Sequence, residues 1–178
     1  MVIIDFLVIL CFLQVWIHAL AGYYGDEEKE CKCTPQEIQR YLNKISGPLL
    51  DRVDIQIEVK RPRIEKISSR EYIESSKKIQ ERVNTARKIQ LERYKKFGIH
   101  SNAELSTKMV EMFCKVDSKG EELLQIAFKK LRLSVRAYER ILKVARTIAD
   151  LEGAENIEYK HIAEAIQYRS LDTRYFRD

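Results

Sequence analysis

Two arginines in this sequence stand in settings that suit a guanidinium binding a phosphate. Arg52 lies between Asp51 and Asp54, just before a run of alternating apolar residues, and Arg136 lies at the start of an expected helix. A guanidinium is always charged and can bind phosphate oxygens through two parallel hydrogen bonds, and the amino-terminal end of a helix favours a nearby anion. From the residues alone, the alternatives are structural: Arg52 pairs with either aspartate, and Arg136 bridges to Glu139.

The composition excludes several classes of protein. Among 178 residues, 45% are hydrophobic and 33% are charged, so most of the chain is expected to fold in water. The formal net charge of +5 is modestly basic and far short of a histone-like tail. Six glycines and three prolines exclude collagen-like and low-complexity chains, and four poorly spaced cysteines do not make a disulfide scaffold.

Residues 1–21 form an apolar leader, whose side chains charged at pH 7 are Asp5 and, when protonated, His18. A stretch of this length can cross a bilayer as one helix, and its last residues, Ala-Leu-Ala, resemble a signal-peptidase site. The basic start of a signal peptide is missing, because no Lys or Arg precedes Lys29. The alternatives are a membrane or secretory segment and a buried core strand.

After the leader, the sequence predicts one helix and one strand. Thr34 can cap a helix that begins at Pro35, and Glu37 stands three residues after Thr34, as a capping box requires. Over residues 53–59, Val and Ile alternate with polar residues, which is typical of a strand with one buried face. Since one strand cannot make a sheet, it either pairs with residues outside this chain or belongs to a piece of a larger fold.

The rest of the chain is expected to be helical. Capping residues and apolar periodicity indicate helices over residues 76–97, after Ser106 or Thr107, after Asp117 or Ser118, from Ser134 to Gly153, and over 159–170. Gly98 and Gly153 are expected to end helices, and Cys114 to be a buried thiol. The helices should form a bundle of four or five members around Leu123, Leu124, Phe128, Ile141, Leu142, Ile148, Ile162 and Ile166.

Three blocks of sequence carry a resemblance to a known family. They are GYYGDEEKECKCTPQEIQRYLNKISGPLLDRVDI, LRLSVRAYERILKVARTIADLEG and HIAEAIQYRSLD. Together, from Gly22 to about Asp172, they resemble the C-terminal portion of the Mg-chelatase-like AAA+ ATPases of bacteria, the YifB/ComM competence-protein family. The resemblance implies a mainly α fold. In it a helical AAA+ lid bundle follows a remnant, one helix plus one strand, of an α/β P-loop AAA+ core.

The resemblance also implies an organisation along the chain. The apolar leader at 1–21 is followed by the end of the AAA+ core at 22–59, a linker with a long basic helix at 60–98, and the helical lid at 99–178. A reading-frame change or a truncated gene would explain the leader, where the resemblance stops. Neither a P-loop, G-x-x-x-x-G-K-[ST], nor a Walker B motif occurs here. We therefore expect no ATP hydrolysis by this chain alone.

In the family, the arginines that match Arg52 and Arg136 have roles in ATP hydrolysis. Arg52 resembles an arginine finger, which reaches the γ-phosphate of ATP in the neighbouring subunit and neutralises charge in the transition state. Arg136 resembles the sensor-2 arginine, which contacts nucleotide held by the same subunit, and Arg140 is the reserve candidate for that role. Arg146 is expected to be a solvated or packing residue. The implied cofactors are ATP and Mg²⁺, and the implied assembly is a homohexamer.

The resemblance raises the question of zinc at Cys31 and Cys33. In the family, a Cys-Pro-Cys segment precedes a second Cys-x-Cys pair, and four thiolates would suit zinc. Here only the second pair is present, and Ala-Leu-Ala occupies the place of the first. Zinc binding is therefore doubtful, and the alternative is a pair of reduced, exposed thiols.

Family members are thought to act on DNA as motors, and one expected helix carries a surplus of basic residues. These are Lys77, Lys78, Arg82, Arg87, Lys88, Arg93, Lys95 and Lys96, against Glu81 and Glu92. Such a surplus can track phosphates, although an ordinary solvated face would look the same. No base-reading motif is visible, so DNA contact is expected to be sequence-independent.

Two functions remain as alternatives. The first is a fragment of a Mg-chelatase-like ATPase in the cytoplasm, which would supply the finger and the lid. The second is a non-enzymatic helical adaptor, tethered to the membrane by residues 2–21. Insertion of magnesium into a porphyrin, which the family name suggests, has no supporting motif here.

Overall fold

The computed structural model describes residues 30–44, 52–57, 74–131 and 133–169. The chain divides into two compact units, residues 1–44 and residues 45–178, and we call the described part of the second the helical unit. Most of the described residues are helical, and none of them lies in a sheet. The prediction of a mainly α fold is therefore confirmed.

In the first unit, the described element is the short helix α1 (Pro35–Leu42). The backbone N–H of Glu37 donates to Thr34 Oγ1 at 3.3 Å, and the Thr34 N–H donates back to Glu37 Oε2 at 2.8 Å. Pro35 occupies the first turn, where a missing N–H costs nothing. This is the predicted capping box, and it explains why the helix begins at this residue.

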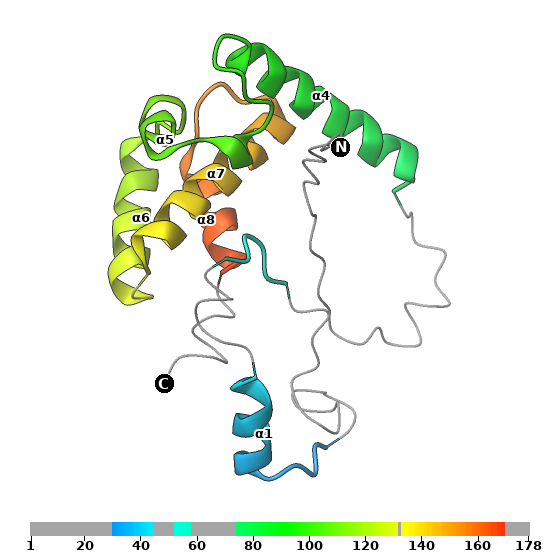
Figure 1. Ribbon diagram of the computed structural model, residues 1–178, viewed down its shortest axis with the longest axis vertical. Coiled ribbons are helices and arrows are strands. Elements are labelled where there is room, and N and C mark those ends of the chain that lie inside the picture. The colour runs from blue at the N-terminus through cyan, green and yellow to red at the C-terminus, as the bar shows by residue number, and fades with distance from the viewer. Residues whose placement is uncertain (1–29, 45–51, 58–73, 132, 170–178) are drawn as a thin grey trace, which may run out of the picture. The chain divides into compact units, whose positions relative to one another are not determined.

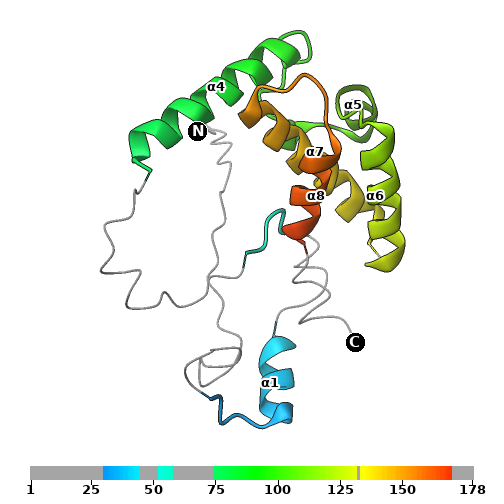
Figure 2. The ribbon, with the colours of Figure 1, turned by 180° about the vertical axis from the view of Figure 1, so that it is seen from behind.

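The helical unit contains five α-helices within its described residues. They are α4 (Ser76–Tyr94), α5 (Thr107–Phe113), α6 (Ser118–Lys130), α7 (Val135–Glu152) and α8 (Tyr159–Gln167), with a short 3₁₀ helix η1 (Asn102–Glu104) between α4 and α5. Helix α7 contacts α4, η1, α5 and α8, and α8 also contacts α6. Figures 1 and 2 show α4 crossing near the carboxyl-terminal end of α7, with its first turns extending beyond the bundle.

The predicted caps account for where these helices begin. Ser75, Asp117 and Ser134 each accept a hydrogen bond from a backbone N–H in the first turn of α4, α6 and α7, at 3.4, 2.9 and 3.1 Å.

Helix α4 ends at Tyr94 with Lys95 as its C-cap, three residues before the predicted end at Phe97, so Gly98 is not the residue that stops it. Helix α7 ends as predicted at Gly153, whose φ angle is 72°. A Cβ makes that conformation unfavourable, so glycine is the residue that stops a helix there.

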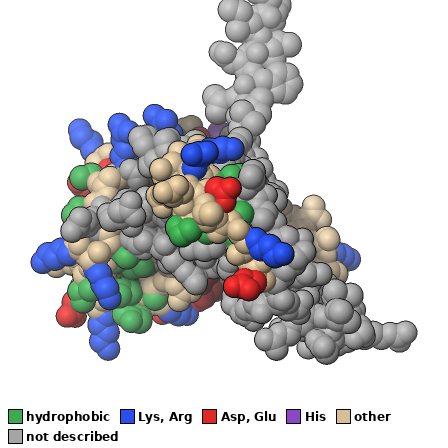
Figure 3. Space-filling model, turned by 90° about the horizontal axis from the view of Figure 1, so that it is seen from below, with side chains coloured by type: hydrophobic (Ala, Val, Ile, Leu, Met, Phe, Trp, Pro, Cys, Tyr) green, Lys and Arg blue, Asp and Glu red, His purple; other side chains and the backbone are tan. Residues whose placement is uncertain are grey.

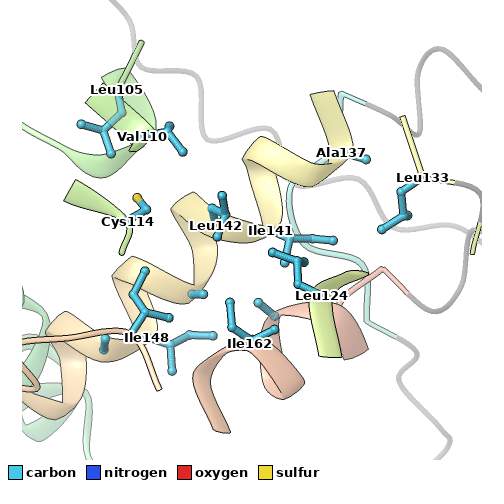
Figure 4. Packing of buried hydrophobic residues seen from close by; sticks show 14 of the residues in the cluster. Leu105, Val110, Cys114, Leu124, Leu133, Ala137, Ile141, Leu142, Ile148 and Ile162 are labelled. Atoms are coloured by element: carbon cyan, nitrogen blue, oxygen red, sulfur yellow. The ribbon is translucent and has the colours of Figure 1, made fainter. Parts of the chain in front are cut away.

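The core lies around α7 (Figure 4). Of the predicted core residues, Leu124, Ile141, Leu142, Ile148 and Ile162 are buried, and Leu123, Phe128 and Ile166 pack against them. Cys114 is buried as predicted, and burial raises the pKa of its thiol to about 11. The sequence analysis did not single out several other buried members of the same cluster: Tyr94, Leu105, Val110, Leu133 and Ile157.

The predicted strand is wrong over residues 53–57, which adopt no β-strand. Ile55 and Ile57, expected on a buried face, are 51% and 64% exposed. The N–H of Gln56 donates instead to the carbonyl oxygen of Tyr168, at the end of α8, at 2.8 Å. A strand needs a neighbouring strand, and here the backbone bonds to a helix end. The last two residues of the predicted strand lie outside the described residues.

The apolar leader also lies outside the described residues. Among the helices that the structure does describe, none combines the length and the apolar character that a membrane span requires.

Candidate functional site

A pocket of about 550 Å³ lies on one face of α7. Arg136, Arg140 and Lys143 line it, spaced four and three residues apart, so they share one side of the helix. Asp54 and Ile55 line it too, although they are some 80 residues away in sequence. The pocket therefore brings together the sensor candidates and the segment that carries the finger candidate.

Arg136 is exposed at the second residue of α7, one turn before Arg140. Ser134 caps the helix start, and the remaining N–H groups of the first turn lend this end a partial positive charge. Within the described residues, no hydrogen bond or ion pair ties up the Arg136 guanidinium, and the alternative bridge to Glu139 is not formed. Its charge is available to an anion at the mouth of the pocket.

Arg140 already has partners. Its Nη1 donates to the carbonyl oxygen of Arg52 at 2.9 Å and to the carboxylate of Asp54. Both bonds are made by Nη1, so they hold the Arg140 guanidinium beside the segment that carries Arg52.

The backbone of the finger candidate is held, while its side chain is exposed. Besides the bond from Arg140 to the Arg52 carbonyl, Arg169 Nη1 donates to the carbonyl oxygen of Val53 at 2.7 Å. Asp54, one of the two expected partners of Arg52, pairs with Arg140 instead. Asp51 is outside the described residues. Within the residues that the structure covers, the Arg52 guanidinium makes no hydrogen bond or ion pair.

Next to this pocket, α7 holds a buried charged network that the sequence analysis missed. Asp150 accepts from Arg93 Nη2 at 2.6 Å and Nη1 at 3.0 Å, from Arg146 Nε at 3.2 Å, and from Asn102 Nδ2 at 2.8 Å. Tyr94 donates to Asn102 Oδ1 at 2.6 Å. The network joins α4, η1 and α7, which are neighbours only in the folded chain.

The network shows which role Arg146 has. Its side chain is 2% exposed, and its guanidinium also donates to the carbonyl oxygens of Ala154 and Glu155 at 2.7 and 2.8 Å. Burial lowers the pKa of Arg146, and the negative charge of Asp150 acts in the opposite direction. Of the two predicted possibilities, solvated or packing, Arg146 is the packing residue.

Cys31 and Cys33 are half-buried and not joined in a disulfide. Over the described ranges, no group of three or more His, Cys, Asp and Glu side chains is placed to hold a metal ion. The predicted half site therefore gains no further ligand from the described residues.

The basic surplus of α4 is partly neutralised. Arg82 pairs with Glu74 at 3.0 Å, and Arg93 pairs with Asp150. Figure 3 looks at the molecule from the side away from α4, and on that face Lys and Arg side chains are scattered among acidic and apolar ones. The structure thus adds nothing specific to the prediction of DNA contact.

Arg169 and Asp54 are the site residues that sequence reasoning overlooked. Arg169 lies within the block HIAEAIQYRSLD, but apolar periodicity does not mark a buried arginine. Their partners are 116 and 86 residues away. The one available signal was the occurrence of both residues in blocks that resemble the family.

Comparison with known families covers most of the chain. The family described as magnesium chelatase, subunit ChlI C-terminal, matches residues 73–169, and the family described as magnesium chelatase, subunit ChlI, matches residues 11–67. The second match begins inside the apolar leader. The expectation that the resemblance stops at Gly22 is therefore wrong.

Curated relatives agree with this result. Competence protein ComM of Haemophilus influenzae is 46% identical over 141 residues, which is 79% of this chain and 27% of ComM. The uncharacterized protein YifB is 41% identical in Escherichia coli and 39% identical in Salmonella typhimurium, over 85% of this chain and 29% of each relative. The chain thus spans less than a third of the length of these relatives. It belongs to the Mg-chelatase-like family that includes ComM and YifB.

Proposed function

We propose that this chain supplies an arginine finger, Arg52, and a nucleotide-sensing lid, with Arg136 as sensor 2, to a Mg-chelatase-like AAA+ ATPase. The observation that supports the proposal is that the segment with Arg52 and the helix with Arg136 meet at one pocket. The segment at Arg52 is bonded to α7 one turn after Arg136. Both guanidinium groups are exposed, as groups that contact a ligand outside their own unit must be.

Arg136 is the residue of the pocket that fits the phosphate end of a nucleotide. It is exposed at the start of α7, whereas the carboxylates of Asp54, Glu139 and Glu164 line the pocket along with Arg140 and Lys143. The volume of about 550 Å³ is in the range of ligand pockets. ATP with Mg²⁺ would supply the phosphoanhydride bond that is hydrolysed. Since the sequence contains no P-loop, the nucleotide would be held by an intact core. The part of this chain would be to stabilise charge on the transferred phosphoryl group.

The wider assembly follows from family membership and is part of the proposal. The lid at 99–178 and the core remnant at 22–59 would work within a homohexamer in the cytoplasm, joined by the long basic helix. Contact with DNA in competence or recombination would be through phosphates and independent of sequence.

Complementation in a mixed oligomer tests the finger. The recipient is ComM of Haemophilus influenzae in which the arginine aligned with Arg52 is replaced by alanine. Adding this chain should restore ATP hydrolysis, because Arg52 would reach nucleotide held by a neighbouring ComM subunit, and fingers contribute about 10³-fold or more to the rate. The chain with Arg52→Ala should restore nothing.

The matched control is Arg87→Ala. It removes an exposed arginine of α4, which is distant in sequence from the residues that line the pocket. It should complement as the unaltered chain does. Size-exclusion chromatography establishes that the chain and ComM assemble. Equal ATP hydrolysis with the unaltered chain and with the Arg52→Ala variant, in mixtures shown to assemble, would contradict the proposal.

A further inference from the structure

The segment that carries Arg52 is bonded to α7 and to the end of α8 through residues 52, 53, 54 and 56. Arg140 binds the Arg52 carbonyl and the Asp54 carboxylate, Arg169 binds the Val53 carbonyl, and the Gln56 N–H binds the Tyr168 carbonyl. We call these contacts the clamp. They come from α7 and from the end of α8, the two helices that form the largest contact in the unit.

The clamp holds backbone atoms and leaves the Arg52 side chain exposed. A charged donor makes a stronger hydrogen bond than a neutral one, and Arg169 makes its bond from a site that is 1% exposed. The pair of Arg140 and Asp54 is more open, with side chains 31% and 55% exposed, and by itself would contribute little. The position of the backbone next to the finger therefore depends on several bonds acting together.

We propose that Arg140 and Arg169 are positioning residues for Arg52, which fix the finger segment to the helix that carries Arg136. The proposal rests on the proposed function of Arg52 as a finger. A finger works only within a narrow distance of the phosphate, and a misplacement of about 1 Å costs up to about 100-fold in rate. Since Arg140 lies one turn after Arg136, any movement of α7 when nucleotide binds would also move the finger.

The clamp has a direct readout that does not depend on ATP. The Gln56 amide donates to Tyr168, so its hydrogen exchange reports whether the segment is docked. In the full chain, Arg140→Ala should speed this exchange about two- to fivefold, and Arg169→Met, which keeps the bulk of the side chain without its donors, should speed it about tenfold. Arg52→Ala is the matched control and should leave it unchanged.

The complementation assay then shows whether Arg140 positions the segment that carries Arg52 or contacts the nucleotide itself. Under the proposal, Asp54→Asn and Arg140→Ala both lower kcat, by about 10-fold or more, without changing the concentration of chain needed for half-maximal activity. The double variant is no worse than Arg140→Ala alone, because Arg140→Ala already removes the contact with Asp54. Exchanging the two residues, as Asp54→Arg with Arg140→Asp, restores part of the activity.

Other results overturn the proposal. Nucleotide contact by Arg140 would leave Asp54→Asn fully active and would make the exchanged pair inactive. Unchanged Gln56 exchange in both Arg140→Ala and Arg169→Met, with melting temperatures equal to that of the unaltered chain, would show that these arginines do not hold the segment. Activity retained in Arg52→Ala rejects the finger itself, whatever the exchange data show, so the two failures can be told apart.

Discussion

Asp150 balances the buried charge of the helical unit. Its side chain is fully buried, and it faces two guanidinium groups, from Arg93 on α4 and Arg146 on α7, which are 18% and 2% exposed. Burial, the largest single influence, lowers the pKa of Arg93, but the hydrogen bonds that Arg93 donates to Asp150 and the negative charge of Asp150 contribute to a net rise above its usual value. Removing the carboxylate would leave both positive charges with no negative partner among the described residues.

We therefore expect Asp150→Ala to lower the free energy of unfolding by about 3–5 kcal/mol, the usual cost of breaking a buried ion pair from one side. Urea denaturation followed by circular dichroism measures it. Glu122→Ala, which removes an exposed carboxylate on α6, is the control and should stay within about 0.5 kcal/mol. A loss of similar size in both variants would argue against the network.

At the scale of the element, α7 is the helix on which the rest of the unit is built. One face carries Ala137, Ile141 and Leu142 into the core, and another carries Arg136 and Arg140 to the pocket, which the buried Ile148 also lines. Helices α4, α5 and α8 and the 3₁₀ helix η1 pack against α7, and α6 packs against α8, so the apolar face of α7 organises most of the unit.

Leu142→Asp should unfold the helical unit, because an unpaired carboxylate in an apolar core costs several kcal/mol. Leu142 is 6% exposed, whereas Val135, in the first turn of the same helix, is 69% exposed. Val135→Asp is thus the matched control, and a carboxylate near a helix start should be neutral or slightly stabilising. Circular dichroism and thermal melting compare them; unchanged melting of Leu142→Asp would refute the packing.

At the scale of the molecule, this chain carries the two arginines that we propose act on a nucleotide, and its sequence contains no P-loop to hold one. Its matched relatives are about three times as long. Under the proposed function, the pocket at α7 would be one side of a nucleotide site whose other side belongs to an intact core.

We expect the purified chain to show no ATP hydrolysis above the background of the buffer, since a P-loop is absent from its sequence. A coupled assay for released phosphate measures this, with intact ComM as the positive control. If ATP hydrolysis persists after further purification and is lost in Arg136→Ala, the chain holds ATP through residues other than a P-loop.

Helix starts and ends were predictable because they depend on nearby residues. The capping box at Thr34, the caps at Ser75, Asp117 and Ser134, and the stop at Gly153 involve partners within three or four residues. Apolar periodicity identified the core face of α7 for the same reason. Family membership was likewise contained in the three sequence blocks.

The strand at 53–59 and the roles of Asp54, Arg140 and Arg169 depend on distant partners. Alternation of apolar residues shows that a segment can be a strand, but a strand exists only if another strand is in place to pair with it. Here a helix end and two arginines, 86 to 116 residues away, take that place. The sequence by itself determined where the main helices begin, the core face of α7 and the family. Only the tertiary structure decided which arginine is exposed and which is bonded, because hydrogen bonds between distant residues form only when the fold brings them together.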